Sequence, residues 1–183
     1  MAKHLNTKEE NRQILLCNTH REAKYFLDTL KYRANGNYKK IPNFLIKKNG
    51  EVVSIHQEDV TSFFLPGYKI KSGVVVVCLE NKGWLRRRSK DGKYVDWLDD
   101  IYDSKVCEKK WRGKLFWDSY TDLQIKKTSK IVDKICKKYN IPKISTGHNV
   151  FMEDVEYFKG IVSRSNYNEY WTDINPTFNF ELI

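Results

Sequence analysis

Three side chains that are able to bind a transition metal lie far apart in the sequence. Cys17 ends a short apolar run, His148 follows Gly147, and Asp173 lies shortly before Pro176. A thiolate, an imidazole and a carboxylate are all ligands that zinc accepts, and catalytic zinc combines three protein ligands with an exchangeable water. These residue types are therefore compatible with a hydrolytic zinc centre, although spacing alone does not select them from the other Cys, His and Asp residues.

The elements that carry these residues follow from hydrophobic periodicity. Gln13-Ile14-Leu15-Leu16-Cys17 predicts a buried strand that ends at Cys17 or Asn18. From about Arg21 to Ala34, apolar residues recur on one helical face, and Asn35-Gly36 supplies a stop. Functional side chains are therefore expected where the first strand ends.

Three more elements are predicted further along the chain. Asn49-Gly50 lies between two apolar runs and favours the tight turn of a β-hairpin. The β-branched run from Ser72 to Leu79 is typical of a central strand that is covered on both faces. Thr121 and Gln124 form a capping box that opens a helix, which ends before Asn140 and Pro142. The inner face of that helix is predicted to hold Ile125, Thr128, Ile131, Val132, Ile135 and Cys136.

This order of elements predicts an α/β fold, in which a mixed central β-sheet is flanked by helices. One domain is expected over residues 1–183, with residues 1–12 as an N-terminal extension. Residues 81–120 are rich in tryptophan and charge, so we expect a variable insert with a small hairpin and loops packed over the core.

Composition limits the cellular setting. Hydrophobic residues make up 40% of the chain and no segment is a candidate membrane span, so a soluble protein is expected. Met1 to Gln13 has no apolar core, which predicts synthesis in the cytoplasm without a signal peptide. The four cysteines form no CxxC pair, so reduced thiols are expected.

The net charge of +10 indicates attraction to a polyanion, and nucleic acid, anionic lipid and cell-wall polymers all qualify. The dense run from Arg86 to Arg88, with Lys90, is more typical of a solvated loop than of a binding site. Charge alone therefore does not choose a partner.

The ordered motifs resemble the zinc-dependent N-acetylmuramoyl-L-alanine amidases, a family that includes phage endolysins and peptidoglycan recognition proteins. The similarity runs from about residue 13 to residue 180. Its matching stretches are Ile14 to Asn18, Phe44 to Gly50, Ser72 to Glu80, Tyr139-Asn140-Ile141-Pro142, Gly147-His148-Asn149-Val150, and Asp173-Ile174-Asn175-Pro176-Thr177-Phe178.

The resemblance implies one bound Zn²⁺ with Cys17, His148 and Asp173 as ligands, where Cys17 stands in place of the usual histidine. His20, three residues later, is a rival first ligand. Each residue also has a structural alternative. Cys17 is a candidate for core packing, His148 for a surface or capping position, and Asp173 for a turn before Pro176.

The sequence departs from the family at the positions that assist the metal-bound water. A tyrosine or a glutamate is usual where this chain has Pro42 and Cys78, and Glu80 on the same strand face is a candidate replacement. An oxyanion-stabilising lysine or histidine is usual where this chain has Trp171.

Lys159 or Arg164, in the long loop before Asp173, is a candidate for the missing oxyanion-stabilising role. The same loop is rich in aromatic rings, which favour either a groove for glycan rings and peptide stems or packing in the core. The residues concerned are Tyr157, Phe158, Arg164, Tyr167, Tyr170 and Trp171.

The resemblance implies hydrolysis of the amide between N-acetylmuramic acid and L-alanine in peptidoglycan, as in a phage endolysin that acts on the bacterial cell wall. A monomer is expected. One alternative is a peptidoglycan-binding module of the same fold with impaired catalysis, because the assisting residues are replaced. A basic nucleic-acid-binding protein is a weaker alternative, because no nucleic-acid motif accompanies the charge.

Overall fold

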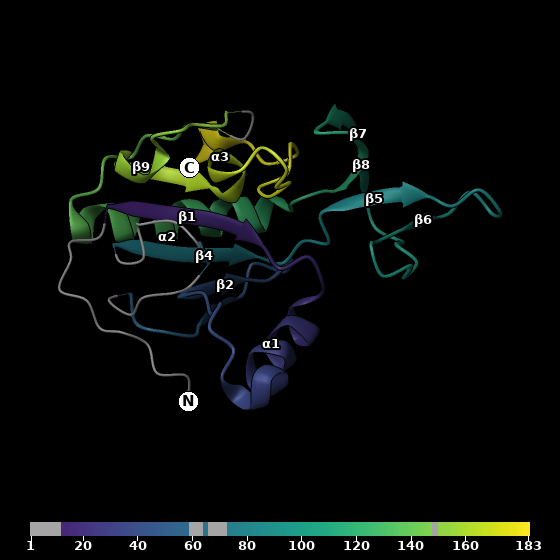
Figure 1. Cartoon of the computed structure of the whole chain (residues 1–183), viewed down its shortest axis with the longest axis horizontal. Coiled ribbons are helices and arrows are strands. Elements are labelled where there is room, and N and C mark those ends of the chain that lie inside the picture. Colours follow the sequence, from purple (N-terminus) through teal and green to yellow (C-terminus); the bar gives the residue numbers. More distant parts are fainter. Residues whose placement is uncertain (1–11, 59–63, 66–72, 148–149) are drawn as a thin grey trace.

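The centre of the protein is a five-stranded sheet with the order β3-β2-β4-β1-β9 (Figure 1). The structure is a computed structural model, and it describes residues 12–58, 64–65, 73–147 and 150–183. The strands are β1 (Gln13–Asn18), β2 (Phe44–Ile46), β3 (Val52–Ser54), β4 (Val74–Leu79) and β9 (Gly160–Ser163). Only β3 runs antiparallel to its neighbour, which confirms the predicted mixed sheet.

Strands β1 and β4 lie in the middle of the sheet and are buried along their whole length. Both were predicted from apolar runs, which are typical of strands covered on both faces. Their side chains alternate between two hydrophobic clusters. Leu15 and Val76 pack with Phe26 on one face, whereas Leu16 and Val77 pack with Ile135 on the other.

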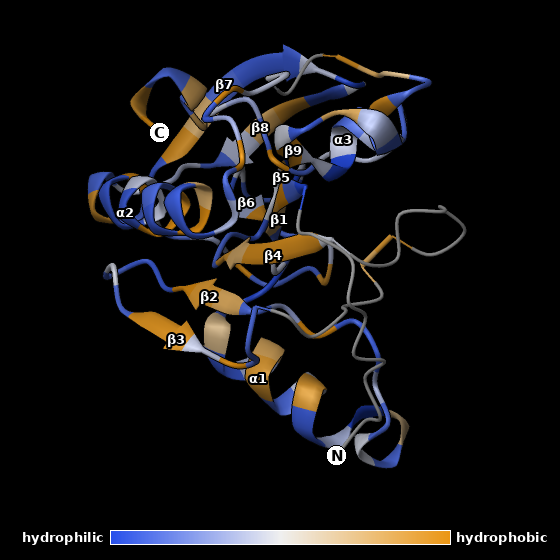
Figure 2. Ribbon diagram, turned by 90° about the vertical axis from the view of Figure 1, so that its left-hand side faces the viewer, coloured by the Kyte–Doolittle hydropathy of each residue, from blue (hydrophilic) through white to orange (hydrophobic). Residues whose placement is uncertain are grey.

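The two long helices therefore cover opposite faces of this sheet, as Figures 1 and 2 show. Helix α1 (Ala23–Tyr32) lies on the first face, and α2 (Asp122–Tyr139) lies on the second. The capping box of Thr121 and Gln124 is present, and Asn140 ends α2 in the left-handed conformation. Short helices follow at Arg33–Gly36, Val155–Tyr157, Arg164–Tyr167 (α3) and Phe180–Leu182.

The predicted hairpin is also present, because β2 and β3 pair around a tight turn. Gly50 has a φ of +80°, and its N–H donates to the carbonyl of Lys47 at 2.9 Å. A side chain with a Cβ adopts this backbone conformation at a cost, so glycine is the favoured residue here.

Residues 81–120 form more structure than the sequence predicted. They build a second, antiparallel sheet with the order β6-β5-β8-β7 at the right of Figure 1. Its strands are β5 (Trp84–Arg87), β6 (Tyr94–Val95), β7 (Val106–Trp111) and β8 (Lys114–Asp118). Arg112 and Gly113 join β7 to β8 with φ angles of 47° and 73°, as a two-residue hairpin loop requires.

A buried polar network joins the two sheets. The side-chain amide of Asn175 donates to the side-chain oxygen of Asn81 and to the carbonyl of Asp118, both at 3.0 Å. Asn81 also donates to the carbonyl of Asp118 at 3.0 Å. Because unpaired amides are costly in a protein interior, these bonds fix the C-terminal segment against β8 and against the link from β4 to β5.

Cys17 and Cys78 form a disulfide, which corrects the expectation of reduced thiols at these two positions. The two residues lie directly opposite each other in β1 and β4, with Cα atoms 4.8 Å apart, and this separation suits a disulfide. Cys107 and Cys136 are free.

Within the described part of the chain, no helix is both long and apolar enough to cross a membrane. The proposed N-terminal extension falls almost entirely outside the described residues, which begin at residue 12.

Candidate active site

Asp173 is a buried carboxylate at the carboxyl end of β1. Only 1% of the residue is exposed. Its Oδ2 accepts a hydrogen bond from the backbone N–H of Asn18 at 3.3 Å and lies 3.4 Å from Nη1 of Arg164. The carbonyl of Asp173 accepts from the N–H of Ser165 at 2.8 Å. Asp173 is therefore fixed by both its backbone and its side chain.

The charges around Asp173 keep it ionised. Burial by itself raises the pKa of Asp173, but the Arg164 guanidinium and His20 lower the pKa to about 2, with help from the N–H of Asn18. At neutral pH the group is consequently an anion, which is the form that binds a metal.

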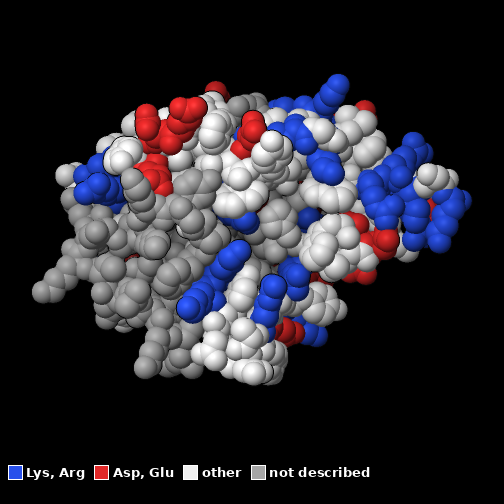
Figure 3. Space-filling view, in the orientation of Figure 1, with Lys and Arg blue, Asp and Glu red and all other residues white. Residues whose placement is uncertain are grey.

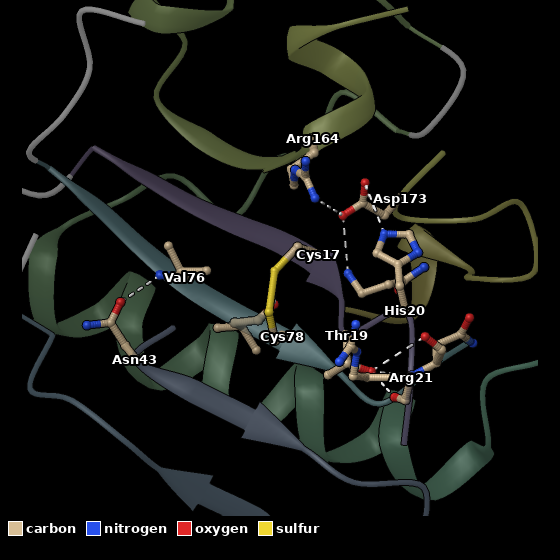
Figure 4. Close-up of a disulfide and its surroundings, with 12 residues drawn as sticks. Cys17, Thr19, His20, Arg21, Asn43, Val76, Cys78, Arg164 and Asp173 are labelled. Carbon is tan, nitrogen blue, oxygen red and sulfur yellow. Dashed lines mark hydrogen bonds and ion pairs between the residues drawn. A yellow bond between two sulfur atoms is a disulfide. The ribbon is translucent and has the colours of Figure 1, made fainter. Parts of the chain in front are cut away.

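His20 lies beside this carboxylate, just beyond the end of β1. Its Nε2 is 3.8 Å from Oδ1 of Asp173 (Figure 4). The residue has a φ of 57°, and its carbonyl accepts a hydrogen bond from Nε1 of Trp97 at 2.7 Å. A Cβ placed on Gly83 would lie 2.9 Å from Nδ1 of His20. A glycine at position 83 therefore leaves the space that the imidazole ring occupies.

Arg164 reaches the site from α3. Strand β9 is parallel to β1 and pairs Ser163 with Leu16, so the residue after β9 emerges at the same edge of the sheet as Asn18. The guanidinium stacks on the ring of Trp171, 4.3 Å from its centroid. Nε of Arg164 is buried with no hydrogen-bond partner among the described residues. Of the two residues predicted to replace the oxyanion-stabilising group, Arg164 is at the site.

These residues line a cleft of about 400 Å³. Its lining consists of His20, Trp84, Trp97, Arg164, Tyr170, Trp171, Thr172 and Asp173. Four aromatic rings therefore surround one acidic and two basic groups. The predicted loop residues divide between roles: Tyr170 and Trp171 line the cleft, Tyr167 is buried in the core, and Tyr157 is 72% exposed outside the cleft lining.

Cys17 does not offer a thiolate in this structure. Its sulfur is bonded to that of Cys78, and the residue is fully buried. Zinc binds the negatively charged thiolate form of cysteine, and a disulfide sulfur carries no such charge. The prediction of Cys17 as first ligand therefore fails in this disulfide form, and His20, the rival first ligand, is the residue that lies beside Asp173.

Glu80 and Lys159 do not line the cleft around Asp173. Oε1 of Glu80 accepts from the N–H of Ala23 at 2.7 Å, and Oε2 accepts from the N–H of Lys48 at 2.8 Å, so both oxygens brace backbone instead of facing the cleft. Lys159 directly precedes Gly160, which pairs with Gln13 at the start of β1. That start lies about 16 Å from the end of the strand.

His148 lies outside the described residues, so its role as a ligand stays a prediction from the sequence. The residues on either side are described. Nδ2 of Asn166, in α3, donates to the carbonyls of Gly147 at 2.8 Å and Val150 at 2.7 Å. Within the described ranges, no cluster of three or more His, Cys, Asp or Glu residues is close enough to hold a metal ion.

The geometry of His20 and Asp173 fits two ligands of one zinc ion. The separation of 3.8 Å between Nε2 and Oδ1 is too long for a hydrogen bond. Two ligand atoms on a tetrahedral zinc lie about 3.4 Å apart. A small movement of the partly exposed imidazole would bring Nε2 and Oδ1 to this separation. One nitrogen and one carboxylate oxygen, both at a cleft wall, are a chemically suitable donor pair.

Arg112 is a residue of the site region that sequence reasoning missed. From the β7–β8 turn, its guanidinium donates to the carbonyls of Asn168 at 2.6 Å, Trp171 at 2.5 Å and Ser165 at 2.8 Å. These three carbonyls belong to the segment between Arg164 and Asp173. The second sheet therefore holds the loop that carries both charged groups of the cleft.

Solved structures with a similar fold include amidases. The N-acetylmuramyl-L-alanine amidase AmiD from E. coli, in complex with anhydro-N-acetylmuramic acid-L-Ala-D-γ-Glu-L-Lys, aligns with a TM-score of 0.60 at 12% identity. The alignment covers 98% of this chain and 58% of the AmiD chain. The N-acetylmuramoyl-L-alanine amidase LysC from Clostridium intestinale aligns with a TM-score of 0.55 at 12% identity, over 94% of this chain and 81% of LysC.

AmpDh3 from Pseudomonas aeruginosa, in complex with anhydromuramic pentapeptide, gives a TM-score of 0.58 at 13% identity, over 98% of this chain and 62% of that one. No protein-family model matches the sequence, and no curated protein matches it. At these identities the comparisons establish the fold: a mixed α/β domain of the type found in N-acetylmuramoyl-L-alanine amidases. The chain spans less than two thirds of the length of AmiD.

Proposed function

We propose that this chain is a zinc-dependent amidase that hydrolyses the bond between N-acetylmuramic acid and L-alanine in peptidoglycan, and that it acts on the bacterial cell wall as a phage endolysin. The observation that carries the proposal is the pairing of His20 with the buried anion Asp173 in a cleft of an amidase-type fold. Fold similarity alone does not specify chemistry, so the proposal rests on these side chains.

Zinc would be held by His20 and Asp173, with His148 as the third ligand predicted from the sequence. When bound, zinc polarises the scissile carbonyl and makes its water ligand more acidic. Asp173 brings the negative charge that such a cation requires, because its pKa of about 2 leaves it ionised. The backbone N–H of Asn18 orients the carboxylate by binding Oδ2, which leaves Oδ1 directed toward His20.

Arg164 provides the cation that stabilises negative charge on the substrate carbonyl oxygen during attack. Its side chain is 19% exposed and lies at the wall of the cleft, and its guanidinium stacks on Trp171. A charge that is already fixed in place stabilises a developing oxyanion without reorganisation. This assignment gives Arg164 the role that a lysine or histidine has in the family that the sequence resembles.

A second function, peptidoglycan binding without hydrolysis, is favoured by one observation. The Arg164 guanidinium already compensates the charge of Asp173 at 3.4 Å. A buried carboxylate with an arginine partner does not require a metal for charge balance. Measurement of products separates this function from the amidase.

The experiment is product analysis on purified peptidoglycan. The protein with zinc is expected to release peptides that begin with L-alanine, detected as new amino termini and by mass spectrometry. Asp173→Ala and His20→Ala are expected to lower the rate at least 100-fold, because each removes a ligand. Lys159→Ala, at the opposite end of β1, is the matched control and is expected to keep the wild-type rate.

Release of reducing sugars without new alanine amino termini would show that the activity is that of a glycosidase and not of an amidase. Binding of peptidoglycan without any release of product would leave the non-hydrolytic function. Equal rates of hydrolysis for wild type and Asp173→Ala would show that the cleft beside Asp173 does not carry out the reaction.

A further inference from the structure

The cleft beside Asp173 has one wall that the sequence did not predict. Trp84 and Trp97 come from β5 and from the loop after β6, so the second sheet supplies them. Tyr170 comes from the C-terminal loop. Rings from two separate parts of the chain therefore line one cleft.

Two of these rings are unusually accessible. Tyr170 is 81% exposed and Trp97 is 44% exposed. Large aromatic residues that stay in contact with water lose the hydrophobic stabilisation that burial gives. When such rings gather in a cleft, they mark a ligand site rather than a packing role.

Trp97 is also held in position before any ligand arrives. Its Nε1 donates to the carbonyl of His20 at 2.7 Å, and the Arg21 guanidinium lies 5.7 Å from its ring centroid. The segment that carries Tyr170 is held by Arg112, which binds the carbonyl of Trp171, the next residue. Rings that are already ordered lose little entropy on binding.

The charges of the cleft select the chemistry of the ligand. The basic side chains of its lining are those of Arg164, which is paired with Asp173, and of His20. In Figure 3, Lys and Arg gather instead at the end of the molecule where β5 and β6 lie, and Arg86 and Arg87 there are exposed. A nucleic acid would require cations for its phosphates. The cleft therefore suits a neutral ligand.

We propose that Trp97 and Tyr170 form a saccharide subsite that binds an N-acetylated sugar ring of the glycan strand next to His20 and Asp173. A pyranose ring presents a face of C–H groups, which packs on an aromatic ring, and an edge of hydroxyl and acetamido groups for hydrogen bonds. The assignment deepens the proposed amidase function, because it states which part of the substrate the second sheet contacts.

The test uses a peptide-free oligomer of N-acetylglucosamine as the probe, with titration calorimetry on the full chain. Tyr170→Ala and Trp97→Ala are expected to raise the Kd about tenfold each, as loss of one ring contact implies. Tyr170→Phe and Trp97→Phe keep a ring and are expected to stay within about twofold of wild type. Tyr157→Ala, exposed but outside the cleft lining, is the matched control and is expected to leave the Kd unchanged.

Trp97→Ala also removes the hydrogen bond to His20, whereas the side chain of Tyr170 projects into solvent, so Tyr170→Ala keeps the test independent of folding. His20→Ala separates the two proposals: it is expected to abolish hydrolysis while the oligosaccharide Kd stays within about twofold. If wild type binds the oligosaccharide but does not hydrolyse peptidoglycan, the result would contradict the amidase and support the saccharide subsite.

Three results would overturn the saccharide subsite. The first is no binding of the oligomer by wild type at millimolar concentration. The second is an unchanged Kd in both alanine variants. The third is single-stranded DNA that binds more tightly than the oligomer and loses affinity in Tyr170→Ala, which would make the aromatic wall a nucleobase site.

Discussion

Nη1 of Arg112 lies 2.5 Å from the carbonyl oxygen of Trp171 and so connects the second sheet to the loop that carries Asp173. The same guanidinium binds two further carbonyls, those of Asn168 and Ser165. A forked guanidinium suits this arrangement because its donors diverge in one plane. The geometry of the cleft therefore depends on a residue about 60 positions earlier in the chain.

Arg112→Ala is expected to lower the affinity for zinc about tenfold, because the loop between Arg164 and Asp173 loses its three anchors. Arg112→Lys, which has one ammonium nitrogen in place of the forked guanidinium, is expected to give an intermediate loss. Competition with a chelating dye measures this affinity independently of hydrolysis. Arg86→Ala, an exposed position in the same sheet, is the control, and an effect as large as that of Arg112→Ala would indicate general destabilisation of the sheet.

The ion pair between Arg164 and Asp173 predicts a pH dependence of stability. The pKa of Asp173 is lower in the folded chain than in the unfolded chain, so its contribution is complete above about pH 4 and is lost as the pH falls toward 2. With metal chelated, Asp173→Asn is expected to lower the free energy of unfolding by about 2 kcal/mol at pH 7.

Urea denaturation from pH 2 to pH 7 measures this difference. The gap between wild type and Asp173→Asn is expected to close below pH 4. A gap that stays constant across that range would show that the charge of Asp173 is not the source of the stability.

Arg164→Ala is expected to lower kcat about 100-fold with a smaller change in KM, because a cation at the oxyanion acts in the transition state. Arg164→Lys keeps the charge and is expected to recover part of the rate. Steady-state hydrolysis of a soluble muropeptide gives both constants. An increase in KM alone would make Arg164 a substrate-binding group instead.

The disulfide between Cys17 and Cys78 gives a separate prediction about stability. The two cysteines are 61 residues apart, and closing a loop of this length stabilises a protein by about 2–4 kcal/mol. Reduction is expected to lower the free energy of unfolding by this amount, measured in urea with and without a thiol reductant. The Cys17→Ser/Cys78→Ser double variant is the control, and it is expected not to respond to the reductant.

Thiol counting checks the same pairing directly. The unfolded, unreduced protein is expected to show two reactive thiols, those of Cys107 and Cys136. Four thiols before reduction would contradict the disulfide.

The elements predicted correctly are those whose local signals agree with their tertiary environment. Strand β1 is apolar from Ile14 to Cys17 because both its faces are covered, and α2 begins with the capping box of Thr121 and Gln124. The second sheet was not foreseen, because β7 has mostly charged or partly exposed residues and lacks a clear alternation.

The sequence was enough to select several residues of the site, but it was not enough to predict which residues contact one another. Asp173 and Arg164 were selected from the sequence, and they do meet. The choice between Cys17 and His20 depends on the register of β1 against β4, which local sequence does not determine. The contact between Trp97 and His20 spans 77 residues and likewise has no local signature.

The most direct test of the account is the zinc content of the purified protein, measured by mass spectrometry in wild type, His20→Ala and Cys17→Ser. Wild type and Cys17→Ser are expected to retain about one zinc per chain, and His20→Ala is expected to lose it, because the imidazole is a ligand and the disulfide sulfur is not. Full zinc in His20→Ala together with its loss in Cys17→Ser would contradict the proposed centre and return the first ligand to the thiolate of Cys17.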